Sequence, residues 1–174
     1  MYFLDDIELL QQLISQGDWA CLPTDAGWCA CALHPSNIDI ESESESKIEE
    51  LDDWTCLVAD TMMFKAVVPD LHPRIDTLLS LHRKPLSLYF KDSDVQVVRI
   101  ATHPLIKHLI QTLDQPIWAK RLYDSGQAVL NFEDIPMSIL KAAAYVSSDK
   151  SKKDFELPVL ASYNHKANLK FIRE

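Results

Sequence analysis

A threonine and an aspartate stand side by side where an apolar segment breaks into a turn. Residues 20–22 are apolar, Pro23 interrupts them, Thr24 and Asp25 follow, and the chain turns at Gly27. A strand that carries a hydroxyl and a carboxylate into a loop is a common way to build a binding site on a rigid scaffold. The same two side chains can instead satisfy the backbone of an ordinary turn. The pattern is therefore compatible with a site or with a turn.

Cationic residues near the ends of three predicted strands form a second candidate group. Arg99 lies near the end of one strand, residues 82–84 (His-Arg-Lys) precede another, and Lys120 and Arg121 follow a third. If these strands are neighbours, their ends converge on one positively charged mouth, which suits a phosphate or a carboxylate. Ordinary solvent-facing charges are the alternative interpretation of the same residues.

Familiar catalytic and metal-binding motifs are missing from the sequence. The chain has only three glycines, which excludes a glycine-rich phosphate loop. Its six histidines are scattered, and we expect them in loops or at the surface. The four cysteines, at positions 21, 29, 31 and 56, form no C-x-x-C pair and have no matching histidine set. They predict buried free thiols in a reducing compartment, and we assign no metal site.

Bulk composition favours one cytoplasmic domain. A chain of 174 residues that is 47% hydrophobic fits a single domain spanning residues 1–174 with a real core. The net charge of -9 argues against an extended nucleic-acid surface, although a local basic pocket remains compatible with it. The start of the chain lacks the features of a signal peptide, and no stretch has the roughly 18 apolar residues of a membrane span. We therefore expect no membrane partner.

The hydrophobic pattern alternates between helical and strand spacing. It predicts helices at 7–16, 62–68, 73–81, 104–113 and 135–145, and strands at 19–22, 55–59, 86–90, 95–100, 116–119, 159–162 and 169–172. The acidic run from Glu41 to Ser46 predicts a solvated loop or helix face rather than an interaction tail, and residues 47–51 a short helix. Because a hairpin joins the strands at 86–100, we expect a mixed α/β (α+β) sheet rather than a doubly wound parallel one.

The order of these motifs resembles the YrdC-like family, the threonylcarbamoyladenylate synthases. Those enzymes make the activated carbamate of threonine from ATP, threonine and bicarbonate for tRNA modification. The resemblance covers nearly the whole chain through segments that match family motifs in the same order: residues 23–30 for P-T-D-T-x-Y-G-L, 83–88 for P-G-P-L-T-L, 99–104 for R-x-P-x-H-P, 116–126 for P-L-x-x-T-S-A-N-x-S-G and 171–174 for I-R-x-G. It implies a twisted mixed β-sheet with surrounding helices and a concave ligand mouth.

The departures from the family pattern fall where the chemistry is expected. In the K-x-R-P motif, Lys47 is the best match for the lysine, and Glu49 stands where the family has arginine. In the T-S-A-N motif, all four residues are replaced, by residues 120–123 of this chain. Ala26 stands for the second threonine of the opening motif and Trp28 for its tyrosine. Each lost charge-assisted bond matters on the scale of roughly 1.5–3 kcal/mol, so several losses together predict much weaker ATP binding.

Our leading hypothesis is a divergent, catalytically impaired YrdC-like protein related to tRNA threonylcarbamoyladenosine biosynthesis. It would bind a nucleotide, a small anion or double-stranded RNA. The candidate binding residues are Thr24, Lys47, Arg99, Lys120, Arg121 and Ser125. No residue is assigned a catalytic role.

Two alternatives remain open at this stage. In the first, the chain is an active synthase with a rewired site. Thr24 then helps to hold threonine, while Arg99, Lys120, Arg121 and Lys47 hold the phosphates of ATP with Mg²⁺. In the second, the fold serves as a non-catalytic scaffold for a protein partner.

Overall fold

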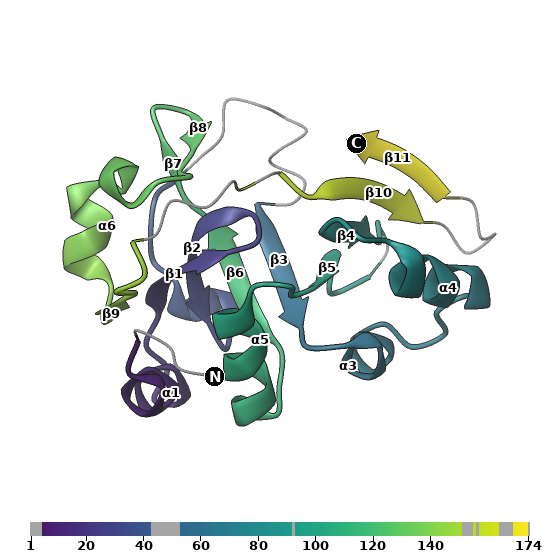
Figure 1. The fold of residues 1–174 in the computed structure, drawn as a ribbon, viewed down its shortest axis with the longest axis horizontal. Coiled ribbons are helices and arrows are strands. Elements are labelled where there is room, and N and C mark those ends of the chain that lie inside the picture. The colour runs from purple at the N-terminus through teal and green to yellow at the C-terminus, as the bar shows by residue number, and fades with distance from the viewer. Residues whose placement is uncertain are drawn as a thin grey trace.

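Nine strands form one twisted mixed sheet in the order β11-β10-β4-β5-β3-β6-β2-β1-β9 (Figure 1). This computed structural model describes residues 5–42, 53–91, 93–150, 155, 157–163 and 169–173. The strands of the large sheet are β1 Ala20–Thr24, β2 Gly27–Ala32, β3 Trp54–Val58, β4 Leu86–Tyr89, β5 Val97–Ile100, β6 Ile117–Arg121, β9 Tyr145–Val146, β10 Val159–Tyr163 and β11 Leu169–Arg173. A separate two-stranded ribbon pairs β7 Tyr123–Asp124 with β8 Gln127–Ala128.

The pairing confirms the predicted mixture of parallel and antiparallel strands. The hairpins β1–β2, β4–β5 and β10–β11 are antiparallel, as are the pairs β2–β6 and β3–β6. The pairs β3–β5, β4–β10 and β1–β9 are parallel. Hairpins and crossovers thus contribute to one sheet, which is the mixed α/β architecture that the sequence predicted.

Local signals in the sequence place most helix ends correctly. The described helices are α1 Ile7–Ser15, α3 Thr61–Val67, α4 Pro73–Leu81, α5 Pro104–Leu113 and α6 Met137–Ala142. The Asp6 carboxylate caps α1 by accepting a hydrogen bond from the backbone N–H of Leu9 at 3.0 Å. Proline opens both α4 and α5, where its missing N–H costs nothing.

Several predicted boundaries were wrong: β1 does not break at Pro23 but continues to Thr24, and β5 begins at Val97 rather than at residue 95. The last helix ends at Ala142 rather than at residue 145, because Tyr145 and Val146 leave helical geometry to pair with β1 at the sheet edge. The strand predicted at 116–119 continues through Arg121, because β2 and β3 both extend their pairing with it. The predicted helix at 47–51 and most of the acidic run lie outside the described residues.

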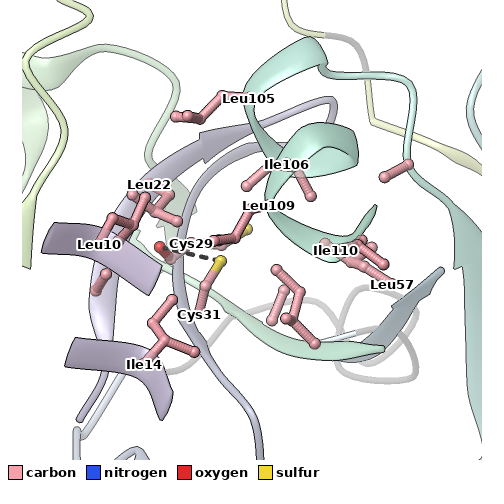
Figure 2. Close-up of a cluster of buried hydrophobic side chains, with 14 of the residues drawn as sticks. Leu10, Ile14, Leu22, Cys29, Cys31, Leu57, Leu105, Ile106, Leu109 and Ile110 are labelled. Carbon is pink, nitrogen blue, oxygen red and sulfur yellow. Dashed lines mark hydrogen bonds between the residues drawn. The ribbon is translucent and has the colours of Figure 1, made fainter. Parts of the chain in front are cut away.

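The two faces of the sheet have separate cores. We call face A the side of Leu22, Cys29 and Leu57, which α1 and α5 cover (Figure 2). The opposite side, face B, packs against α3 and α4 over strands β3, β4, β5 and β10. Near β1 and β2, face B is closed by Trp28 and by Ile135 and Ile139 from the α6 region. The covering of both faces leaves few places where a polar group of the sheet can meet a ligand.

Among the described residues, no helix is both long enough and apolar enough to cross a bilayer.

Candidate functional site

Two buried arginines share a small hollow on face A. The register pairs Cys29 with Arg121 and Leu57 with Arg99, so both arginines point to the same side as the apolar core under α5. Ala26, Cys29, Asp53, Thr55, Arg99, Ala119 and Arg121 line this space, which we call the arginine hollow. It is so narrow that it leaves no room for a free water molecule. The arrangement brings two guanidinium groups together with Asp53 in a contracted space.

Arg99 forms a buried ion pair with Asp25. Its Nε lies 3.1 Å from Oδ1 of the carboxylate, and the two side chains are only 1% and 6% exposed. Its Nη1 donates a hydrogen bond to the hydroxyl of Ser87 on the neighbouring strand at 3.2 Å. Because a buried charge is costly unless it is paired and hydrogen-bonded, Asp25 and Ser87 together make the burial of Arg99 possible.

Thr102 holds the other oxygen of Asp25. Oδ2 accepts hydrogen bonds from the backbone N–H and from the hydroxyl of Thr102, both at 3.1 Å. Thr102 follows β5, whereas Asp25 lies in the turn between β1 and β2. The carboxylate therefore fastens the tip of one hairpin to the segment that leads into α5.

The Thr24 side chain holds the turn on which Asp25 stands. Its hydroxyl donates to the carbonyl of Gly27 at 2.9 Å and accepts from the N–H of Ala26 at 3.0 Å. The same oxygen lies 3.4 Å from Sγ of Cys29, a residue that lines the arginine hollow. The hydrogen bonds of Thr24 are therefore those of a turn residue, and its side chain also lies beside the arginine hollow.

Gly27 is required by the shape of this turn. Its φ is +100°, and a Cβ placed on it would lie 2.7 Å from the carbonyl oxygen of Val129. The next residue, Trp28, donates its N–H to that same oxygen at 2.9 Å. The hairpin tip is thus held against the segment after β8, which fixes the direction in which Asp25 leaves the turn.

Lys120 and Arg121 lie on opposite faces of the sheet. Because both belong to β6, strand alternation separates them, and the prediction that they follow the strand was wrong. Arg121 is 2% exposed and lines the arginine hollow. On face B, Lys120 donates from Nζ to the carbonyl of Ile40 at 3.0 Å and lies 5.6 Å from the ring centroid of Trp54.

The predicted site residues therefore separate into groups. Thr24, Arg99 and Arg121 converge around Cys29, whereas Lys120 does not join them. Ser125 is exposed in the turn of the β7–β8 ribbon. Lys47 lies outside the described residues.

The thiols are free and buried, as the sequence predicted. Burial raises the pKa of Cys29, and the side-chain hydrogen bond between Thr24 and Cys29 and the charges of Arg121 and Arg99 offset only part of that rise. Burial also raises the pKa of Cys56 to about 12. A protonated thiol is a weak nucleophile, so these groups pack as small apolar side chains at neutral pH. Within the described part of the chain, no cluster of His, Cys, Asp and Glu could hold a metal ion.

A second hollow lies on the other side of Thr102. It has a volume of about 80 Å³ and combines apolar walls with a cationic side: Leu79, His82, Lys84, Pro85, Leu86, Ile100 and Thr102. The Nδ1 of His82 lies 2.8 Å from the carbonyl oxygen of Lys84, which orders this rim. Thr102 lines this hollow and also holds the Asp25 carboxylate, the partner of Arg99.

Several members of this site were not predicted from the sequence. Ser87, Thr102, Asp53 and Thr55 received no role, and Asp25 was named without its partner. Strand alternation is the signal that could have found Ser87. Ser87 interrupts the apolar pair Leu86 and Leu88, which predicts that it points away from their core.

Comparison with known proteins supports the fold. The sequence matches no protein-family model and no curated protein. The structure of P. abyssi Sua5 complexed with L-threonine aligns with a TM-score of 0.75 at 14% identity over 96% of this chain and 53% of that one. E. coli YciO aligns with a TM-score of 0.73 at 13% identity, covering 97% and 88% of the two chains.

Full-length HypF in a phosphate- and nucleotide-bound form also contains the fold, with a TM-score of 0.64 at 12% identity over 98% of this chain and 29% of HypF. This chain spans about half the length of the Sua5 structures that it matches. The expected architecture is thereby confirmed at the level of three-dimensional structure. The protein has the YrdC-like fold, with a sequence that has diverged far from these structural relatives.

Proposed function

We propose that this chain is a YrdC-like domain that binds a small anion, such as phosphate or the phosphate of a nucleotide, and that has lost threonylcarbamoyladenylate synthesis. The observation that carries the proposal is the convergence of Arg99 and Arg121, both nearly fully buried, on one hollow of face A. Guanidinium groups match the planar geometry of carboxylates and phosphates and hold them by charge-assisted hydrogen bonds.

The structural relatives support this class of ligand. One Sua5 structure is complexed with L-threonine, and the HypF structure is described as phosphate- and nucleotide-bound. L-Threonine, phosphate and nucleotides all carry anionic groups. They make a link to tRNA threonylcarbamoyladenosine biosynthesis the natural hypothesis for this chain as well.

The same site argues against synthase activity. Arg99 is already paired with Asp25, and the hollow as it stands has no preformed space in which threonine and ATP could be held together. Lys120, which a rewired site would need, lies on face B. Burial of Arg99 and Arg121 also disfavours double-stranded RNA, because RNA backbone contacts need exposed cationic side chains.

The test combines one activity assay with one binding assay. We expect no pyrophosphate release from ATP, threonine and bicarbonate with Mg²⁺, and measurable heat when inorganic phosphate or ATP is titrated into the protein. Threonine-dependent pyrophosphate release would replace this proposal with the active-synthase hypothesis. Absence of both signals would reject anion binding and leave a protein partner as the next hypothesis.

Neighbouring substitutions on β6 locate the site. Arg121→Gln should weaken phosphate binding at least tenfold, whereas Lys120→Gln, its matched control on face B, should leave the affinity within twofold of the native value. Far-UV circular dichroism establishes that both variants are folded. Equal losses in both variants would mean that the anion does not bind in the arginine hollow.

A further inference from the structure

The Asp25 carboxylate is the anionic partner of the buried Arg99 side chain. Its Oδ1 lies 3.1 Å from Nε of Arg99, and its Oδ2 accepts two hydrogen bonds from Thr102. A carboxylate held by one guanidinium, one backbone N–H and one hydroxyl has the set of donors that proteins use for anionic ligands. We propose that Asp25 is an internal competitor: it fills the anion position in the resting protein, and an external anion binds by displacing it.

This inference rests on the proposed function and adds a mechanism of regulation to the same site. Exchange of one anion for another keeps Arg99 paired throughout, so the buried guanidinium never lacks a counter-charge. Simple addition of a second anion would instead place a negative charge beside a pair that is already neutral. The contracted hollow has no space for such an addition.

The turn allows Asp25 to move without disrupting the sheet. Asp25 is not part of a strand, and the backbone around it is held independently by the Thr24 hydroxyl, which bonds Ala26 and Gly27. A rotation of the Asp25 side chain therefore breaks its contacts with Arg99 and Thr102 and leaves the β1–β2 pairing intact. Its three described contacts are the only ones that the exchange must replace within the described part of the chain.

Internal competition lowers the apparent affinity of the native chain. When the binding-competent form is a minor fraction of the molecules, the apparent dissociation constant rises by the inverse of that fraction. Removal of the competing charge should reverse this effect. The inference thus predicts that loss of a carboxylate strengthens anion binding, the opposite of what loss of an ordinary binding residue does.

The experiment compares Asp25→Asn with Asp124→Asn, which makes the same change in net charge on an exposed residue of β7. Inorganic phosphate and ATP are titrated calorimetrically into each variant and into the native protein. We expect Asp25→Asn to bind at least one of them tenfold more tightly or better, with Asp124→Asn unchanged. Added phosphate should also raise the melting temperature of Asp25→Asn by more than that of the native protein, because it restores the missing counter-charge.

The outcomes separate this inference from the proposed function. If the native protein binds phosphate and folded Asp25→Asn binds no more tightly, internal competition is overturned while anion binding stands. If only Asp25→Asn binds, competition is supported, and the native chain is not an anion-binding protein under those conditions. If no form binds, both ideas fail.

Asp25→Glu covers the case in which Asp25→Asn does not fold, because it keeps a negative charge for Arg99. Its extra methylene shifts the carboxylate, so the ion pair and the two bonds from Thr102 cannot all be kept at their present lengths. The weakened internal competitor should let phosphate bind about threefold more tightly. Unchanged or weaker phosphate binding by folded Asp25→Glu would overturn the inference.

Discussion

The buried pair of Arg99 and Asp25 makes a quantitative prediction through a double-mutant cycle. Asp25→Ala leaves a guanidinium that is 1% exposed with only the Ser87 bond described for it, which should cost about 3–5 kcal/mol of unfolding free energy. Arg99→Met leaves a carboxylate that keeps both bonds from Thr102, so its cost should fall near the lower end of that range. Either loss is a large part of the stability of an ordinary domain.

The double variant should be much less destabilised than the two single variants suggest. With both charges removed, no ion is left buried without a partner, and a cavity and the loss of a few hydrogen bonds remain. We therefore expect Asp25→Ala/Arg99→Met to be about 3 kcal/mol more stable than additivity predicts. Urea unfolding followed by circular dichroism in phosphate-free buffer at pH 7 measures all four corners of the cycle.

An exposed pair of the same chain supplies the control. Lys65 and Asp76 lie 2.6 Å apart, but their side chains are 50% and 37% exposed. Because water screens such a pair, its cycle should give a coupling below about 1 kcal/mol. If the Arg99–Asp25 coupling is as small as that of this control, Asp25 is not the group that balances Arg99, and the reasoning about the site is refuted.

Three further predictions test the surrounding structure. Gly27→Ala should destabilise the protein by about 2 kcal/mol or more, as measured by urea unfolding. The reason is that φ of Gly27 is +100° and the new methyl group would lie 2.7 Å from the carbonyl oxygen of Val129. A loss of stability below about 0.5 kcal/mol would contradict this prediction. Asp114→Gly should raise stability by about 0.5–1 kcal/mol, because Asp114 ends α5 with φ of 53°, a conformation that glycine adopts without strain; a lower melting temperature would argue against it. Burial raises the pKa of the Cys56 thiol to about 12 in the folded chain, against 9.0 for an ordinary thiol. As the pH rises, the unfolded chain therefore loses this proton before the folded chain does. The free energy of unfolding should then fall by about 1.4 kcal/mol per pH unit between those two pKa values. Comparison of urea midpoints for the native protein and Cys56→Ala at pH 8 and pH 10.5 isolates this contribution, and parallel pH profiles would disprove it.

The sequence predicted the elements of the fold well where a local signal exists. Asp6, Pro73 and Pro104 mark helix starts by chemistry that acts within one turn, and the structure uses all three. The end of α6 was misplaced because Tyr145 and Val146 pair with residues more than a hundred positions away. Such a pairing leaves no trace in the local hydrophobic pattern.

The site was predictable in part. Arg99 and Arg121 were expected to converge because of their positions near strand ends, and the structure places both at the arginine hollow, with Thr24 beside it. Lys120 was grouped with them because the strand was predicted to end at residue 119; two more residues of strand place it on the other face. The link between Asp25 and Thr102 depends on how the hairpin tip lies against β5, which is a property of the folded chain.

The place of β4 in the sheet has a consequence for synthesis on the ribosome. One neighbour of β4 is β5, which follows it directly, but its other neighbour is β10, which ends at Tyr163. At ordinary translation rates, the roughly 70 residues between β4 and the end of β10 take about 4–15 seconds to add. During that interval β4 has one unpaired backbone edge, which is the kind of surface that recruits strands from other chains. The nascent chain therefore exposes this edge of β4 until β10 has been made, and chaperone protection matters during that period.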